Sequence, residues 1–235
     1  MYIPKHFEGT EAQGREIMQS HGWALLTTAD ADGAPLTTHL SLVWEDDGSP
    51  HGSLIGHMAR ANGHWKLFSR GAPSLALFWG PHAYVSPTWY APGPKVPTWN
   101  YVTVHAYGRP EIVEATPAVL MVLTKLAAVY EGVGNDAWGL GRLPPGNAAA
   151  QTKNIVAFRM KLDRVETKLK LSQNRELEDR QRVIAKLEAA GNDDARGTAK
   201  WMKRVLPSGG CLETNSCASA CRDCVSGTSS GRVLG

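Results

Sequence analysis

One seven-residue segment, Gly56-His-Met-Ala-Arg-Ala-Asn62, combines residue types that bind anions. If a strand ends at His57 and the chain then turns, the side chains of His57, Arg60 and Asn62 project around exposed backbone amides. A guanidinium offers a bidentate fork for phosphate, and turn amides add neutral donors. For this segment alone, a surface arginine beside a helix-capping asparagine is the commoner explanation. The segment therefore predicts a phosphate site only together with other residues.

A second polar segment, Thr37-Thr-His-Leu-Ser41, predicts a strand with two unlike faces. One face carries Leu36, Thr38, Leu40 and Leu42, and the other carries Thr37, His39 and Ser41. Polar residues gathered on one face of a strand point to solvent, which is the simpler explanation, or to a polar ligand.

Two aromatic segments that contain proline follow at residues 84–90 and 96–101. Proline restricts such strands to edges or bulges, where an interface or a planar ligand is accommodated. Trp89, Trp99 and Tyr101 are suited to stacking on a flat ring, and equally to filling a core or a dimer interface.

The last predicted strand ends in a segment rich in hydrogen-bonding side chains, Lys168-Leu-Lys-Leu-Ser-Gln-Asn-Arg175. Those able to reach a phosphate or a ring carbonyl group are Lys170, Ser172, Gln173, Asn174 and Arg175. The alternative is a strand-to-helix junction in which Ser172 or Asn174 caps the next helix.

The elements that must position these residues are mostly short strands. The pattern predicts strands at 22–29, 34–44, 52–57, 64–69, 74–79, 83–90, 97–108 and from 156 toward 171, separated by turns such as Asp32-Gly33 and Gly80-Pro81. Helices are predicted at 10–20, where Thr10 and Gln13 have capping-box spacing, at 116–130 with Thr116 as N-cap, at 176–190 and at 194–205. This order predicts an antiparallel β-barrel with peripheral helices.

Charge is unevenly distributed along the 235 residues, although the net charge is only +3. The net charge is −3 for residues 1–152, +6 for residues 153–206 and zero for residues 207–235. A solvated basic helix face is the common cause of such a stretch, and a nucleic-acid surface is the alternative. The residues of that candidate DNA surface are Arg180, Arg182, Lys186, Lys200, Lys203 and Arg204.

The four cysteines all lie between Cys211 and Cys224. We expect residues 1–206 to form one domain and residues 207–235 to be a disordered Cys/Gly/Ser-rich tail. A single CxxC pair gives little support to a zinc site, so no metal is expected. The cysteine-free body and the lack of an apolar leader after Met1 predict a cytoplasmic protein, and no apolar stretch is long enough to cross a membrane.

Six segments resemble the PaiB family of FMN-binding negative transcriptional regulators in order and approximate spacing, over about residues 1–206. They are Met1-Tyr-Ile-Pro-Lys-His-Phe7, Thr38-His-Leu40, Gly56-His-Met-Ala-Arg-Ala-Asn62, Gly80-Pro-His-Ala-Tyr-Val-Ser-Pro-Thr-Trp-Tyr90, Val96-Pro-Thr-Trp-Asn-Tyr101 and Lys170-Leu-Ser-Gln-Asn-Arg175. The resemblance implies a mainly β fold, the flavin-reductase-like split β-barrel, with peripheral helices and a C-terminal helical segment. It also implies a homodimer with FMN near the subunit interface.

The resemblance places the phosphate end of FMN at His57, Arg60 and Asn62. The residues it assigns to the whole site are Thr38, His39, Leu40, His57, Arg60, Ala61, Asn62, Trp99, Asn100, Lys170, Ser172, Gln173, Asn174 and Arg175. The chain departs from the family pattern at Ser41 and Gly63, where proline is usual, and both changes introduce a freer residue.

The function expected from these residues is FMN binding in a regulator, acting on DNA directly or through flavin-linked sensing. A flavin-dependent oxidoreductase is the first alternative, because a fold does not decide a function. Haem binding through His39, His57, His64 or His82 is the second. No catalytic residue is identified.

Overall fold

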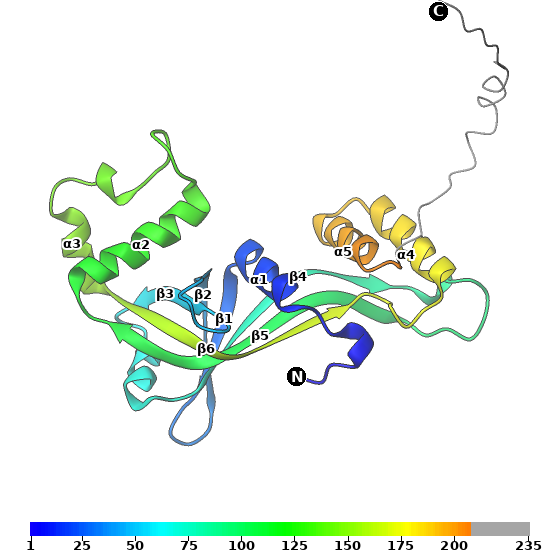
Figure 1. Cartoon of the computed structure of the whole chain (residues 1–235), viewed down its shortest axis with the longest axis horizontal. Coiled ribbons are helices and arrows are strands. Elements are labelled where there is room, and N and C mark those ends of the chain that lie inside the picture. Colours follow the sequence, from blue (N-terminus) through cyan, green and yellow to red (C-terminus); the bar gives the residue numbers. More distant parts are fainter. Residues whose placement is uncertain (208–235) are drawn as a thin grey trace, which may run out of the picture.

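Six antiparallel strands close into a ring in the computed structural model, which describes residues 1–207 (Figure 1). Around the ring the order is β1-β2-β3-β6-β5-β4, and pairing between β1 and β4 closes it. The strands are β1 (Trp23–Ala29), β2 (Pro35–Glu45), β3 (Ser53–Ala59), β4 (Ser74–Val85), β5 (Thr98–Val113) and β6 (Ile155–Lys170). The predicted split β-barrel is confirmed.

The interior of the barrel follows from the two-residue alternation of the strands. Along β1 the side chains of Ala24, Leu26 and Thr28 are fully buried, while their neighbours are more exposed. Phe78 of β4 and Phe158 of β6 are also fully buried. Since successive side chains point to opposite faces of a strand, each strand gives one face to this core and leaves the other outside.

Residues 64–69 form a 3₁₀ helix, η2 (Gly63–Arg70), and the prediction of a strand there is wrong. The side chain of Asn62 accepts a hydrogen bond from the amide of His64 and starts the helix. His64 and Phe68 are buried, with their rings 5.5 Å apart, and Phe68 packs on Phe158. These two buried rings pack the helix against the barrel core.

Gly80-Pro81 is a bulge within one long strand and not the predicted turn between two strands. The register between β4 and β5 shifts between Trp79 and His82. Proline cannot donate to the ladder, and bulges tolerate it. A Cβ at Gly80 would lie 2.6 Å from Cγ2 of Val102, so glycine permits this close approach.

The helices lie outside the ring (Figure 1). They are α1 (Glu11–Ser20), α2 (Thr116–Glu131), α3 (Asn147–Gln151), α4 (Leu177–Ala189) and α5 (Asp193–Arg204), with short 3₁₀ turns η1 (Lys5–Phe7), η3 (Pro87–Trp89), η4 (Leu140–Arg142) and η5 (Thr152–Asn154). The predicted capping box of Thr10 and Gln13 is present. The N-cap of α2 is Ala115, one residue before the predicted Thr116.

Long strands β5 and β6 connect two groups of helices, with α2 and α3 at one end of the molecule and α4 and α5 at the other (Figure 1). None of the helices in residues 1–207 has both the length and the apolar character that a bilayer crossing requires. Except for Pro207, the tail predicted from residue 207 onward lies outside the described residues.

Candidate functional site

The turn that follows β3 offers hydrogen-bond donors without partners. The amide of Arg60 donates to Asn154 O, and that of Asn62 donates to Ala59 O. The amides of Ala61 and Gly63 donate to no group in the part of the chain that the structure describes. Unpaired amides in a tight turn form a concave site for anions.

The side chain of Arg60 is only partly available to a ligand. Its Nε donates to Lys153 O and its Nη2 to Ile155 O, both at 2.8 Å. These two bonds join the turn to the start of β6 and leave Nη1 unpaired within residues 1–207. Arg60 also borders a cavity of about 290 Å³, whose wall includes Trp65, Glu114, Thr116 and Lys153. The guanidinium also lies 5.9 Å from the centre of the Trp65 ring, so the predicted phosphate end has a cationic group with one nitrogen left for a ligand.

A hydrogen-bonded network lies directly beneath this turn and contains His64, which the resemblance did not assign to the site. His64 Nδ1 lies 2.8 Å from Thr38 Oγ1, and Nε2 lies 2.8 Å from Thr28 Oγ1. Asn62 Nδ2 donates to Thr38 Oγ1 at 3.2 Å. The structure thus brings the predicted residues Thr38 and Asn62 together through a fully buried histidine.

The remaining predicted residues of this half lie on β2 and β3. Leu40 is buried in the core, whereas His39 is exposed on the outer face, stacked near Trp23 with ring centroids 6.3 Å apart. His57 Nδ1 is buried and has no hydrogen-bond partner among the described residues. Burial lowers the pKa of His57 below its usual value, so the ring is neutral at pH 7. An orphaned nitrogen three residues before Arg60 fits a site that a ligand completes.

The second half of the predicted site is the junction between β6 and α4. Asn100 is fully buried and accepts a hydrogen bond from Ser172 Oγ at 3.0 Å, while its own amide donates to the sulfur of Met202 at 3.3 Å. Ser172 has φ +64°, a conformation that non-glycine residues rarely adopt. Residues held in such conformations are frequent at functional sites.

Side chains of this junction serve mostly to hold it together. Gln173 accepts from the amide of Leu171 and donates to Leu169 O. Neither Ser172 nor Asn174 caps α4, whose N-cap is Glu176 without a side-chain bond, so the capping alternative is wrong. Asn174 is exposed.

Two cationic side chains lie at the surface of the same junction. Arg175 lies over the ring of Tyr90 at 5.2 Å. Lys170 donates to Thr98 Oγ1 and to Trp99 O. Burial, and then the positive charges of Lys168 and Arg175, lower the pKa of Lys170.

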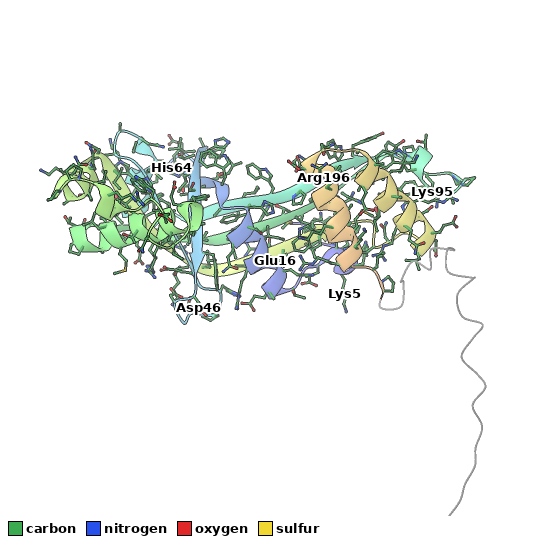
Figure 2. All side chains as sticks on the ribbon, turned by 90° about the horizontal axis from the view of Figure 1, so that it is seen from above. Lys5, Glu16, Asp46, His64, Lys95 and Arg196 are labelled. Carbon is green, nitrogen blue, oxygen red and sulfur yellow. The ribbon has the colours of Figure 1, made fainter. Side chains whose placement is uncertain are left out.

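The two halves lie at opposite ends of the molecule. The turn containing Arg60 adjoins Ile155, the first residue of β6, and the second cluster surrounds Lys170, the last. Ile155 and Lys170 are the two ends of a sixteen-residue strand, which in extended form separates them by up to roughly 50 Å. In Figure 2, His64 of the first half and Lys95, which neighbours the second, lie far apart along the long axis. A single copy of the chain does not bring the predicted residues into one site.

An exposed aromatic face lies on the outside of β1, β4 and β5 and reaches the second half at Trp99, whose carbonyl accepts from Lys170. It consists of Trp23, Trp79, His82, Tyr84 and Trp99. Trp23 and Trp99 are 58% and 53% exposed, and Trp99 lies about 6 Å from both His82 and Tyr84. A cavity of about 560 Å³ opens between Trp79, His82, Trp99 and Tyr101. Exposed apolar patches of this kind mark interaction or ligand sites.

Comparison with known proteins supports the predicted family. Residues 1–164 match the family described as "Putative FMN-binding domain". "Protease synthase and sporulation protein PAI 2" of Bacillus subtilis is 34% identical over 209 residues, which cover 88% of this chain and 98% of that protein. The chain belongs to the PaiB family.

Solved structures similar to this PaiB family member include "Structure of the FAD and Heme binding protein from Mycobacterium smegmatis", with a TM-score of 0.54, 15% identity and coverage of 78% of each chain. The flavocytochrome Anf3 from Azotobacter vinelandii has a TM-score of 0.56 and 12% identity over 72% of each chain. At such identities the likeness shows a shared split-barrel fold alone.

The histidines proposed as haem ligands differ in availability. Both ring nitrogens of His64 are hydrogen-bonded and the ring is fully buried, so His64 is not free to bind iron. His39 and His82 are exposed, and His82 Nδ1 lies 3.8 Å from Asp194. Within residues 1–207 no group of three or more His, Cys, Asp or Glu side chains is arranged to hold a metal ion.

The replacement of the usual family proline by Gly63 generates a stability prediction. Gly63 is the first residue of η2, its amide has no partner in the described chain, and a Cβ there meets no atom within 4 Å. Asn62 has φ −75° and ψ 115°, which suits a residue before proline. We expect Gly63→Pro to raise the free energy of unfolding by about 0.4–1 kcal/mol, measured by urea denaturation.

The matched control is Gly71→Pro at the other end of η2. Gly71 has φ +63° and its amide donates to Phe68 O, so proline there must destabilise the protein. A loss of stability in Gly63→Pro comparable to that in Gly71→Pro would contradict the geometry assigned to the turn.

Proposed function

We propose that this chain binds FMN noncovalently and that the turn after β3 holds its phosphate. The observation that carries the proposal is the pair of donors at this turn without partners in residues 1–207, the amide of Ala61 and the Nη1 of Arg60. The amide of Gly63 is a further donor, which the usual family proline lacks. Together they offer neutral and cationic hydrogen bonds to a dianion, and the family to which the chain belongs is described as FMN-binding. The orphaned Nδ1 of His57 adds a buried polar atom that a ligand satisfies.

We further propose that the complete site forms between two copies of the chain. FMN is much shorter than the roughly 50 Å between the two predicted halves. In a dimer with two-fold symmetry, the turn of one subunit and the Lys170 cluster of the other face the same ligand, and two equivalent sites result. The exposed aromatic face supplies the apolar surface that an intimate dimer buries, and its tryptophans are suited to stacking on a flat ring.

The regulatory role is proposed to depend on flavin and not on a basic DNA-binding helix. Arg182 pairs with Glu178, Lys203 with Glu188 and Arg204 with Glu16, while Arg180 is buried and donates to Val205 O. Among the residues of the candidate DNA surface, only Lys186 and Lys200 are both exposed and without an ion pair in the described chain. A bound flavin supplies a two-electron redox group, so its presence or redox state is the signal that such a regulator reports. A cytoplasmic location fits this role and stays a prediction.

Removing the guanidinium of Arg60 tests the phosphate site. Loss of a hydrogen bond to a charged group corresponds to roughly a ten- to hundredfold weaker affinity, so we expect Arg60→Ala to raise the Kd of FMN by that factor in a flavin-fluorescence titration. Arg142 is a matched control, because its Nε and Nη2 also donate to two backbone carbonyls but in a remote loop. Equal affinities for Arg60→Ala and Arg142→Ala would refute this assignment.

A mixed dimer tests whether two subunits share each site. Chains carrying Arg60→Ala and chains carrying Lys170→Ala bind FMN weakly alone, but a mixed dimer contains one site with both residues intact. After unfolding and refolding the two variants together in equal amounts, we expect about a quarter of the wild-type binding capacity to return. No recovery, with mixed dimers shown by mass spectrometry, would mean that each site lies within one subunit.

The dependence of DNA binding on salt tests the regulatory proposal. Since only Lys186 and Lys200 of the candidate DNA surface are both exposed and without an ion pair in the described chain, we expect this surface to neutralise about two phosphates per subunit. The logarithm of the affinity should then fall with the logarithm of the salt concentration with a slope no steeper than about −2 per subunit. We expect weak binding in gel-shift assays, abolished in Lys186→Ala/Lys200→Ala. A much steeper slope would show that the paired residues also contact DNA.

A further inference from the structure

A chain of side-chain hydrogen bonds passes through the barrel interior and connects the candidate phosphate turn to β1 and β4. It runs from Asn62 to Thr38, to His64, to Thr28 and to Ser74, with Thr28 Oγ1 lying 2.6 Å from Ser74 Oγ. Thr28 and His64 are fully buried, and Ser74 is 3% exposed. Because buried polar groups must be paired, each member constrains its neighbour.

The direction of this chain follows from its two ends. At one end a backbone amide can only donate, so Asn62 Oδ1 accepts from the amide of His64, and Asn62 Nδ2 must be the donor to Thr38. At the other end Ser74 Oγ donates to Ala72 O at 3.5 Å. Either hydroxyl could donate across the contact between Thr28 and Ser74. Because the carbonyl of Ala72 can only accept, we infer that Ser74 donates to it and accepts from Thr28.

The tautomer of His64 follows in the same way. Thr28 gives its proton to Ser74 and must therefore accept from the Nε2–H of His64. A neutral imidazole has one donor and one acceptor, so Nδ1 accepts the hydroxyl proton of Thr38. All hydrogen bonds then point one way, from Asn62 to Ala72.

His64 is the one ionisable side chain in this series of hydrogen bonds from Asn62 to Ser74. The His64 ring contacts Phe68, Thr28 and Thr38, and its backbone amide donates to Asn62. Burial lowers the pKa of the His64 ring. His64 is therefore neutral at pH 7, as the single direction requires.

We propose that His64 is a positioning residue that fixes the donor directions of Thr38 and Asn62 at the ligand-binding turn. In this arrangement the hydroxyl proton of Thr38 points inward to His64, and the second amide hydrogen of Asn62 is left for a ligand. If His64 held its proton on Nδ1 instead, this N–H would donate to Thr38 Oγ1, which already accepts from Asn62 Nδ2. Thr38 would then turn its own hydroxyl proton outward, or the two donors would compete for its oxygen. The inference concerns the site of the proposed function and rests on it.

The experiment substitutes Thr28, which bonds to His64 on the side of the ring away from the turn. Thr28→Val keeps the shape of the side chain but removes the acceptor for Nε2–H, so the imidazole moves its proton to Nδ1. Thr27→Val is the matched control on the same strand, since Thr27 faces outward and bonds only to Thr37 at 2.9 Å. We expect Thr28→Val to weaken FMN binding about three- to tenfold, the effect of one hydrogen bond, and Thr27→Val to leave it unchanged.

A second measurement needs no ligand. The ¹⁵N chemical shifts of the His64 ring in the free wild-type protein report its tautomer, and we expect Nε2–H in the wild type and Nδ1–H in Thr28→Val. If Thr28→Val fails to fold, Ser74→Ala interrupts the chain one residue further on and takes its place. Nδ1–H in the wild type would overturn the proposal, and so would equal FMN affinities for the Thr28 and Thr27 variants.

The two hypotheses fail in different ways. If the wild-type protein binds no FMN, the proposed function is wrong, and the ¹⁵N shifts still decide whether the chain has the direction inferred for it.

Discussion

The length of β6 decides which residues of this protein can meet within one copy of the chain. β6 joins the turn around Arg60 to the cluster around Lys170, and as a nearly continuous strand it also keeps them apart. Its pairing with β3 and β5 stiffens it along its whole length, so no local movement brings its ends together. Residues that the family pattern assigns to one ligand therefore lie at opposite ends of a single subunit.

Each end of β6 is held in a different manner. At the first end, donors are left unpaired at the surface, and a buried polar chain lies beneath them. At the second end, the polar groups of Asn100, Ser172 and Gln173 are satisfied within the chain, and the exposed groups are an indole and cations. The first arrangement suits the phosphate of a nucleotide and the second suits a flat ring. This difference agrees with a ligand whose two ends are recognised by different subunits.

Much of the fold could be predicted from the sequence, because its signals are local. The hairpin at Asp32-Gly33, the capping box of α1 and the alternating strand from residue 156 depend on residues close together in the chain. The misassigned segments depend on tertiary contacts. η2 has the composition of a strand and becomes a helix because Asn62 caps it and Phe68 packs on Phe158, whereas Gly80-Pro81 stays within a strand because β5 continues to pair beyond the bulge.

The candidate site could be predicted only in part for the same reason. The pattern found Arg60 and Asn62, but it could not show that two backbone carbonyls occupy part of the guanidinium. It included His64 only as one of four candidate haem ligands in an alternative function, since nothing in the sequence indicates that its partners are threonines 26 and 36 residues away. The signal that was available is the position of His64 two residues after Asn62.

The central claim is that the flavin lies between two subunits, and a crystal structure of the protein with FMN tests it most directly. We expect the phosphate at the amide of Ala61 and at Arg60 of one subunit, with the ring system against Trp99 and Lys170 of the other. A flavin whose phosphate and ring are both bound by the same chain would contradict it.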